Sequence, residues 1–191
     1  MRWALLYARS RQVPASLAAM VISAAAVWAL ARDGHAGPSD PRLPALALAA
    51  GTTAASVGLG GQDVALDRTA AIRWAPRRAV HVLLIGTVVA AVLSAVQTLG
   101  EDLAALAFVV RDGAGLTGLA ALGAVLLGAQ HAWTLPTAWL AFTFVAPPST
   151  YVPTQVATWM LLAPGTPAAT WTALTLALVG TAVYAVAGPK G

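Results

Sequence analysis

Long apolar segments without charged side chains constrain the fold of this chain more than any other feature. Between Ala79 and Gln97, for example, there is no Asp, Glu, Lys or Arg. Only 9% of the residues are charged and 59% are hydrophobic, whereas a soluble domain carries about 25% charged residues. About 20 apolar residues are what a helix needs to cross the hydrocarbon layer. We therefore expect an all-α integral membrane protein, with residues 1–191 forming a single transmembrane domain.

Six transmembrane helices are expected, separated by polar loops rich in Gly, Pro, Ser and Asp. The four clearest helices cover about 14–31, 43–61, 79–97 and 168–187. Two interpretations of the stretch 98–130 are open. In the first, a short helix 4 and a helix 5 are joined by a tight cytoplasmic turn at Arg111-Asp112-Gly113. In the second, 103–130 is one helix with Arg111 near the middle of the membrane.

The cost of burying a charge favours the first interpretation of 98–130. An unpaired arginine at the bilayer centre costs at least ~2.5 kcal/mol on insertion scales. Gly113 and Gly115 also weaken a continuous helix at this point. We therefore expect a break at Arg111-Asp112-Gly113.

Two further segments are expected to lie at the membrane surfaces. In a helical 1–13, Trp3 and Tyr7 share one face while Arg2 and Arg9 share another, which is typical of an interfacial helix. A disordered basic leader is the alternative. The segment 131–167 is interrupted by prolines and rich in Trp and Tyr, which favour the interface. It predicts two short helices, about 135–146 and 153–162, that enter the outer leaflet and return.

The positive charges indicate the orientation of the chain. The loop 62–81 holds four arginines, and cytoplasmic loops carry an excess of Lys and Arg. With six helices, both termini would then be cytoplasmic. The sequence pI of about 10.4 does not indicate nucleic acid as a partner, because the cations cluster at membrane boundaries. Ten arginines to one lysine, in an Ala-rich chain, suggest a GC-rich bacterial genome and hence the bacterial cytoplasmic membrane.

The residues that most enzymes need are missing from the sequence. There is no cysteine, no Gly-x-x-x-x-Gly-Lys phosphate loop and no His-Glu-x-x-His helix. His35, His81 and His131 are far apart in the chain, so each is interpreted as a polar boundary residue rather than a metal ligand. We therefore expect neither a catalytic site nor a cofactor in this chain.

The layout resembles the permease subunit of a type-2 ABC exporter. The features that carry the resemblance are the interfacial helix at 1–13, a cytoplasmic coupling helix at about 66–78, and a re-entrant pair at about 135–162 before the last of six helices. The resemblance covers nearly the whole chain, but it is one of layout, without a diagnostic residue motif.

The resemblance implies that transport and ATP hydrolysis reside in different subunits. A separate cytoplasmic ABC ATPase dimer, which binds ATP and Mg²⁺, would dock under the coupling helix, and a second permease chain would complete the pathway. The side chains expected at the ATPase contact are Asp67, Arg68, Arg73, Trp74, Arg77 and Arg78, with Arg111 and Asp112 as a second, smaller contact. The Gly- and Thr-rich helices at 43–61 and about 116–130 are candidates for the seam between permease chains. The substrate would be a lipid, a hydrophobic peptide or an amphipathic drug.

Two other hypotheses remain open at this point. The chain could be a structural, regulatory or immunity-type membrane protein without a transport cycle, whose arginines only meet anionic lipid and fix topology. It could also be a lipid-modifying enzyme, although no cluster of acids or histidines supports that hypothesis.

Overall fold

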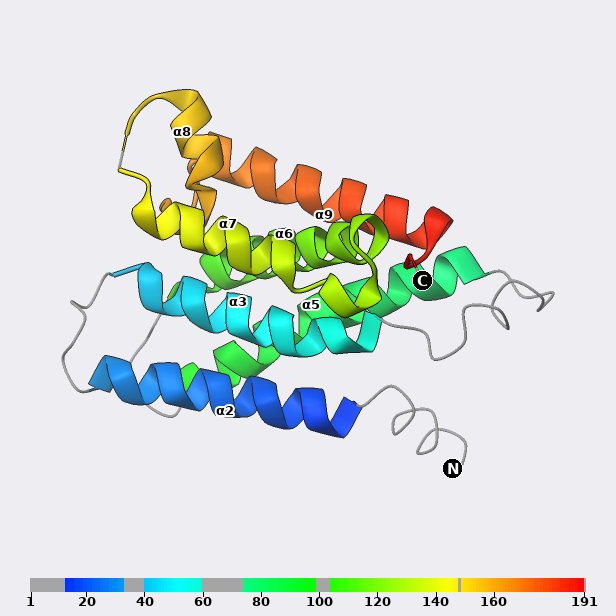
Figure 1. The fold of residues 1–191 in the computed structure, drawn as a ribbon. Helices are drawn as coiled ribbons and strands as arrows, with labels where there is room; N and C mark the ends of the chain where they lie inside the picture. Colours follow the sequence, from blue (N-terminus) through cyan, green and yellow to red (C-terminus); the bar gives the residue numbers. More distant parts are fainter. Residues whose placement is uncertain (1–12, 33–39, 60–73, 99–103, 148, 191) are drawn as a thin grey trace.

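The computed structural model describes residues 13–32, 40–59, 74–98, 104–147 and 149–190 (Figure 1). These residues form an all-α protein, and no strand occurs among them. The helices are α2 (Val13–Arg32), α3 (Arg42–Ser56), α5 (Trp74–Gln97), α6 (Leu106–Leu126), α7 (Thr134–Val145), α8 (Val152–Ala157) and α9 (Pro167–Ala187). Three short 3₁₀ helices are η1 (Val57–Leu59), η2 (Ala129–His131) and η3 (Trp159–Leu161).

Helix α6 is the centre of the bundle, and α3, α5, α7 and α9 pack against it. Small residues make this possible, because they let helix backbones approach closely. Gly118 of α6 and Gly180 of α9 face each other: a Cβ on Gly118 would lie 2.6 Å from Ala177 Cα. Helix α2 lies outside this group and packs on α3 and α5.

Three helices, α5, α6 and α9, are long and apolar enough to cross a membrane. The most apolar stretch of α6 is 67% buried inside the chain, whereas that of α5 is only 17% buried. The surface that α5 and α9 leave uncovered carries large aliphatic side chains such as Leu84 and Leu178. Such a surface suits lipid tails and not water, which supports a multi-pass membrane protein.

The chain runs back and forth along the bundle. Helices α2, α5 and α7 run in one direction, and α3, α6 and α9 return (Figure 1). The start of α2 and the end of α9 therefore lie at the same end of the bundle, which also holds Arg77, Arg78 and Lys190. We call it the basic end, and the other one the opposite end.

Hydrogen bonds from side chain and backbone tie the helix ends together at the basic end. His81 Nε2 lies 3.0 Å from the carbonyl oxygen of Gly58, and Tyr184 Oη donates to the carbonyl oxygen of Leu59 at 2.7 Å. The backbone N–H of Lys190 donates to Ala124 O at 3.0 Å. The ends of α3, α6 and α9 and the start of α5 thus form one connected layer.

The Tyr184 hydrogen bond gives a first testable prediction. Tyr184→Phe should lower the free energy of unfolding by about 1 kcal/mol, because the buried Leu59 carbonyl loses its hydroxyl donor. Thermal unfolding in mild detergent would measure this as a decrease in Tm of a few degrees. Tyr151→Phe, at an exposed tyrosine, is the matched control and should leave Tm unchanged. Equal Tm values for the two variants would contradict the assigned role of Tyr184.

Several helices lie where the sequence predicts them. Helices occur at the predicted 14–31 and 168–187, as α2 and α9, and α3 with its continuation η1 covers 42–59 of the predicted 43–61. Of these, α9 is long and apolar enough to cross a membrane, whereas α2 and α3 do not meet that measure within the described residues. Gly188 ends α9 with a φ of 72°, a conformation that favours glycine. The helix predicted at 79–97 starts earlier, at Trp74, because Pro76 falls in its first turn, where proline is tolerated.

The first interpretation of 98–130 is wrong. Helix α6 is unbroken from Leu106 to Leu126, and Arg111-Asp112-Gly113 lies inside it. The argument for a break assumed an unpaired arginine, but Arg111 is paired with Asp112. Arg111 is also five residues after the start of α6, about 7.5 Å along the axis, and so lies near the opposite end rather than at the middle.

The prediction for 131–167 is confirmed in part. Short helices occur at α7 and at α8 with η3, close to the predicted 135–146 and 153–162. However, α7 follows η2, which lies against η1 near the basic end, and runs from there to the opposite end beside α3 (Figure 1). Only the segment after α7, with α8 and η3, turns back at the opposite end. At 12 residues α7 spans about 18 Å, less than the hydrocarbon layer.

Two predicted elements lie outside the described residues: nearly all of the interfacial helix at 1–13, and the part of the coupling helix before Trp74. The seam between two permease chains at 43–61 and about 116–130 stays a prediction. The buried residues of α3 include Gly51 and Thr52, and those of α6 in the predicted range include Thr117, Gly118 and Gly123. These small side chains are already covered by other helices of the same chain.

Candidate functional site

Charged side chains gather at two places in the described part of the chain. Arg77 and Arg78 lie in the first turns of α5 at the basic end, next to Trp74. Arg111 and Asp112 lie in α6 near the opposite end. In the first group Arg77 is exposed and Arg78 is half-buried, whereas the second group is buried.

At the basic end, Trp74 and the two arginines form a compact group. The Arg77 guanidinium lies 5.8 Å from the centre of the Trp74 ring, a cation–π distance, and Arg77 is exposed. The Arg78 guanidinium packs against Gly188, where any side chain would collide with it. Cations at a helix N-terminus are disfavoured by the helix dipole. The charge of the exposed Arg77 is therefore not stabilised by the dipole of α5.

In α6, Arg111 and Asp112 form a buried ion pair. Arg111 Nε donates to Asp112 Oδ1 at 2.6 Å, and the two side chains are 7% and 0% exposed. The Phe108 ring, one turn earlier, lies 5.2 Å from the Arg111 guanidinium carbon. A charge within a candidate transmembrane segment is costly unless it is paired, and here both a carboxylate and an aromatic face are present.

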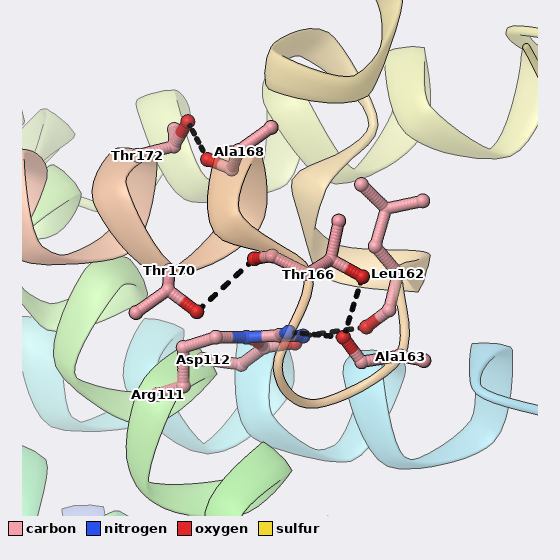
Figure 2. A network of polar contacts seen from close by, with 8 residues as sticks. All are labelled: Arg111, Asp112, Leu162, Ala163, Thr166, Ala168, Thr170 and Thr172. Atoms are coloured by element: carbon pink, nitrogen blue, oxygen red, sulfur yellow. Dashed lines mark hydrogen bonds and ion pairs between the residues drawn. The ribbon is translucent and has the colours of Figure 1, made fainter. Parts of the chain in front are cut away.

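The remaining nitrogens of Arg111 hold the turn before α9. Nη2 donates to Leu162 O at 2.8 Å and Nη1 donates to Ala163 O at 3.0 Å (Figure 2). The Thr166 hydroxyl also donates to Ala163 O, at 2.9 Å. One guanidinium thus connects α6 to the segment that links η3 with α9.

Trp159 of η3 completes this contact. Its side chain is fully buried, and its ring packs directly on Gly115 of α6. A Cβ added to Gly115 would lie 2.5 Å from Trp159 Cη2, so only glycine leaves room for the ring. Gly115 is three residues after Asp112, so the two share a face of α6. Within the described residues, Asp112 Oδ2 and Trp159 Nε1 are buried without a hydrogen-bond partner. Two buried polar atoms without hydrogen-bond partners thus lie on the residues that join α6 to η3.

The structure separates the predicted docking residues into three groups. Trp74, Arg77 and Arg78 lie together at the basic end. The predictions for Asp67, Arg68 and Arg73 lie outside the described residues. Arg111 and Asp112 are corrected: they are buried in α6 near the opposite end, so they are not part of the same exposed surface.

The sequence analysis missed the partners of Arg111. Phe108 could have been found, because it is one turn away on the same helix and an aromatic face is a common partner of arginine. Leu162 and Ala163 contribute only backbone carbonyls, which have no signature in the sequence. Among the described residues, no three His, Cys, Asp or Glu side chains come together to hold a metal ion.

Comparison with protein-family models, curated proteins and solved structures found no match for this chain.

Proposed function

We propose that this chain is the membrane-spanning subunit of an ATP-driven exporter, of the layout found in type-2 ABC permeases. In this proposal it moves a hydrophobic or amphipathic substrate, and a separate ATPase dimer supplies the energy. The observation that carries the proposal is the order of the elements along the bundle. The segments α2, α3, α5, α6, α7 and α9 run in alternating directions and bring the chain back to the basic end, and the short α8 and η3 precede α9. Three of these helices, α5, α6 and α9, are long and apolar enough to cross a membrane, and the proposal takes the other three as passes as well.

The basic end supports docking of a partner. It presents the exposed Arg77 beside Trp74, in the first turn of α5. Aromatic and arginine side chains are the residues most often found at the energetic centre of protein interfaces. We place this end on the cytoplasmic side of a bacterial cytoplasmic membrane, in line with the distribution of positive charge.

A stand-alone structural or regulatory membrane protein is the second candidate, and one observation favours it. The small residues of α3 and α6 are covered within a single chain, so these helices do not offer an open half-pathway. If two permease chains pair, they do so through the faces that the outer helices leave exposed.

The test is a pull-down from native membranes in mild detergent, with mass spectrometry of the proteins that follow. We expect a stoichiometric ABC ATPase, and we expect Arg77→Glu and Trp74→Ala to reduce its recovery at least tenfold because the charge or the anchoring ring is lost. Arg42→Glu is the matched control, since Arg42 is exposed at the start of α3, at the opposite end. Recovery of no ATPase would overturn the proposal in favour of the stand-alone hypothesis. Equal recovery of the ATPase with all three variants would show that Trp74 and Arg77 are not the docking residues.

A further inference from the structure

A half-open groove of about 250 Å³ lies between α5, α6 and α9, the three helices able to cross a membrane. Its lining is made of small side chains, including Gly86, Thr87, Ala90, Ala114, Thr117 and Thr181. Leu83 also lines the groove and is 61% exposed. The groove is therefore hollow because its wall residues are short, and it opens on the surface that faces the hydrocarbon.

The groove presents an apolar surface despite its threonines. The Thr117 hydroxyl donates to Gly113 O at 2.7 Å, and the Thr87 hydroxyl donates to Leu83 O at 2.9 Å. Both hydroxyls are thus used within their own helices. A polar ligand would find little to bond with here, whereas a hydrocarbon chain loses nothing by entering.

The dimensions favour a lipid chain over a helix of another protein. A helix with its side chains is about 10–12 Å across and packs on a face rather than inside a pocket of this volume. An unbranched acyl chain is narrow enough to lie in the groove. The groove lining on α5 runs from Val82 to Ala90, 8 residues or about 12 Å along the axis, which is the length of part of one acyl chain in the ~30 Å hydrocarbon layer.

Two cationic side chains, Arg78 and Lys190, lie at the basic end of the bundle. Arg78 lies one helical turn before Val82, which lines the groove, and its guanidinium contacts Gly188 at the end of α9. Lys190 is exposed two residues further, with its backbone fixed by Ala124 O and by the N–H of Ala129. An anionic group at this depth would be attracted by both side chains.

We propose that this groove is a binding site for an anionic phospholipid, with one acyl chain between α5, α6 and α9 and the phosphate group beside Arg78 and Lys190. The site does not depend on the docking of an ATPase. The proposed occupant of the groove is one membrane lipid and not a second copy of the chain.

The test uses the full chain in mixed micelles of phosphatidylglycerol and phosphatidylcholine, with native mass spectrometry to count the lipids that remain after washing. The wild type should retain one phosphatidylglycerol in clear preference to phosphatidylcholine. Thr87→Phe, which fills the groove from its rim, should abolish retention. Lys190→Gln should weaken it about fivefold, the effect of removing one cation near the headgroups.

Two matched controls distinguish this site from general lipid contact. Leu84→Phe adds a similar ring to an exposed position of α5 outside the groove lining, and Arg42→Gln removes an exposed cation at the start of α3, at the opposite end. Both should retain phosphatidylglycerol as the wild type does. Equal retention of the two lipids, or full retention by Thr87→Phe, would overturn the proposal. So would a dimer of the chain that Thr87→Phe dissociates, because a second copy would then be the occupant.

Discussion

Replacing Arg111 by methionine should lower the free energy of unfolding by about 3–5 kcal/mol. The substitution leaves the Asp112 carboxylate buried without its cation, and the carbonyl oxygens of Leu162 and Ala163 without the two guanidinium donors. Methionine keeps much of the length of the arginine side chain, so loss of packing contributes little. For a chain of this size the change corresponds to a decrease in Tm of about 10 °C, measured by thermal unfolding in mild detergent.

The double variant Arg111→Met/Asp112→Leu separates the charge from the other contacts of Arg111. Removing both members of a buried ion pair is often much less harmful than removing one. We therefore expect the double variant to regain more than half of the Tm that Arg111→Met loses. Arg77→Met, at an exposed arginine of α5, should change Tm by no more than a degree or two. A double variant no more stable than Arg111→Met would show that the carbonyl contacts, and not the charge on Asp112, carry the effect.

Arg111 also shows why the sequence predicted the ends of the helices better than the course of 98–130. The insertion cost of a charge is a property of an isolated helix, and it correctly indicated that Arg111 needs an explanation. Whether the helix breaks at Arg111 or the charge is paired depends on the residues that pack around the guanidinium. Asp112 and two carbonyl oxygens from a segment some fifty residues later satisfy the guanidinium, so the helix has no reason to break there.

Glycine led to a second misinterpretation for a related physical reason. In a soluble helix, Gly113 and Gly115 would weaken the structure, and the sequence analysis counted them as evidence for a turn. In this bundle Gly115 provides the space that the Trp159 ring occupies. Helix propensity is local and could be estimated from the sequence, whereas the position of Trp159 follows from tertiary packing and could not.

The predictions for the helix boundaries near Pro167 and Gly188 had a sounder basis. Proline at the first position of a helix and glycine with positive φ just after the last are local effects, which act whatever the neighbours are. They place the start and the end of α9 correctly. For the candidate site, the sequence could indicate Trp74, Arg77 and Arg78 as one group on a basic segment, because these residues are adjacent along the chain. It could not show that Arg111 and Asp112 lie at the other end of the bundle.

The crossing of α6 and α9 provides the second large expected effect. Gly180→Ala should destabilise the protein by about 3 kcal/mol, the upper part of the usual range for overpacking, because the new methyl group would lie 2.6 Å from the carbonyl carbon of Gly118. Backbone atoms cannot move aside as a flexible side chain can, so the two helices must separate. Gly118→Ala should have an effect of similar size, since its Cβ would meet the backbone of Leu176 and Ala177.

The sign of the change makes this prediction decisive. Alanine is a better helix former than glycine by about 0.8–1 kcal/mol, so Gly180→Ala would raise Tm if α6 and α9 were not in close contact. Gly86→Ala is the matched control: its Cβ would meet only the Thr117 side chain, at 3.3 Å from Oγ1, and its cost should stay below 1 kcal/mol. Thermal unfolding of the three glycine variants in the same detergent gives the comparison. A Tm for Gly180→Ala at or above that of the wild type would mean that α9 does not pack on α6 at Gly118, and the turn that Arg111 holds before α9 would then lack its rigid support.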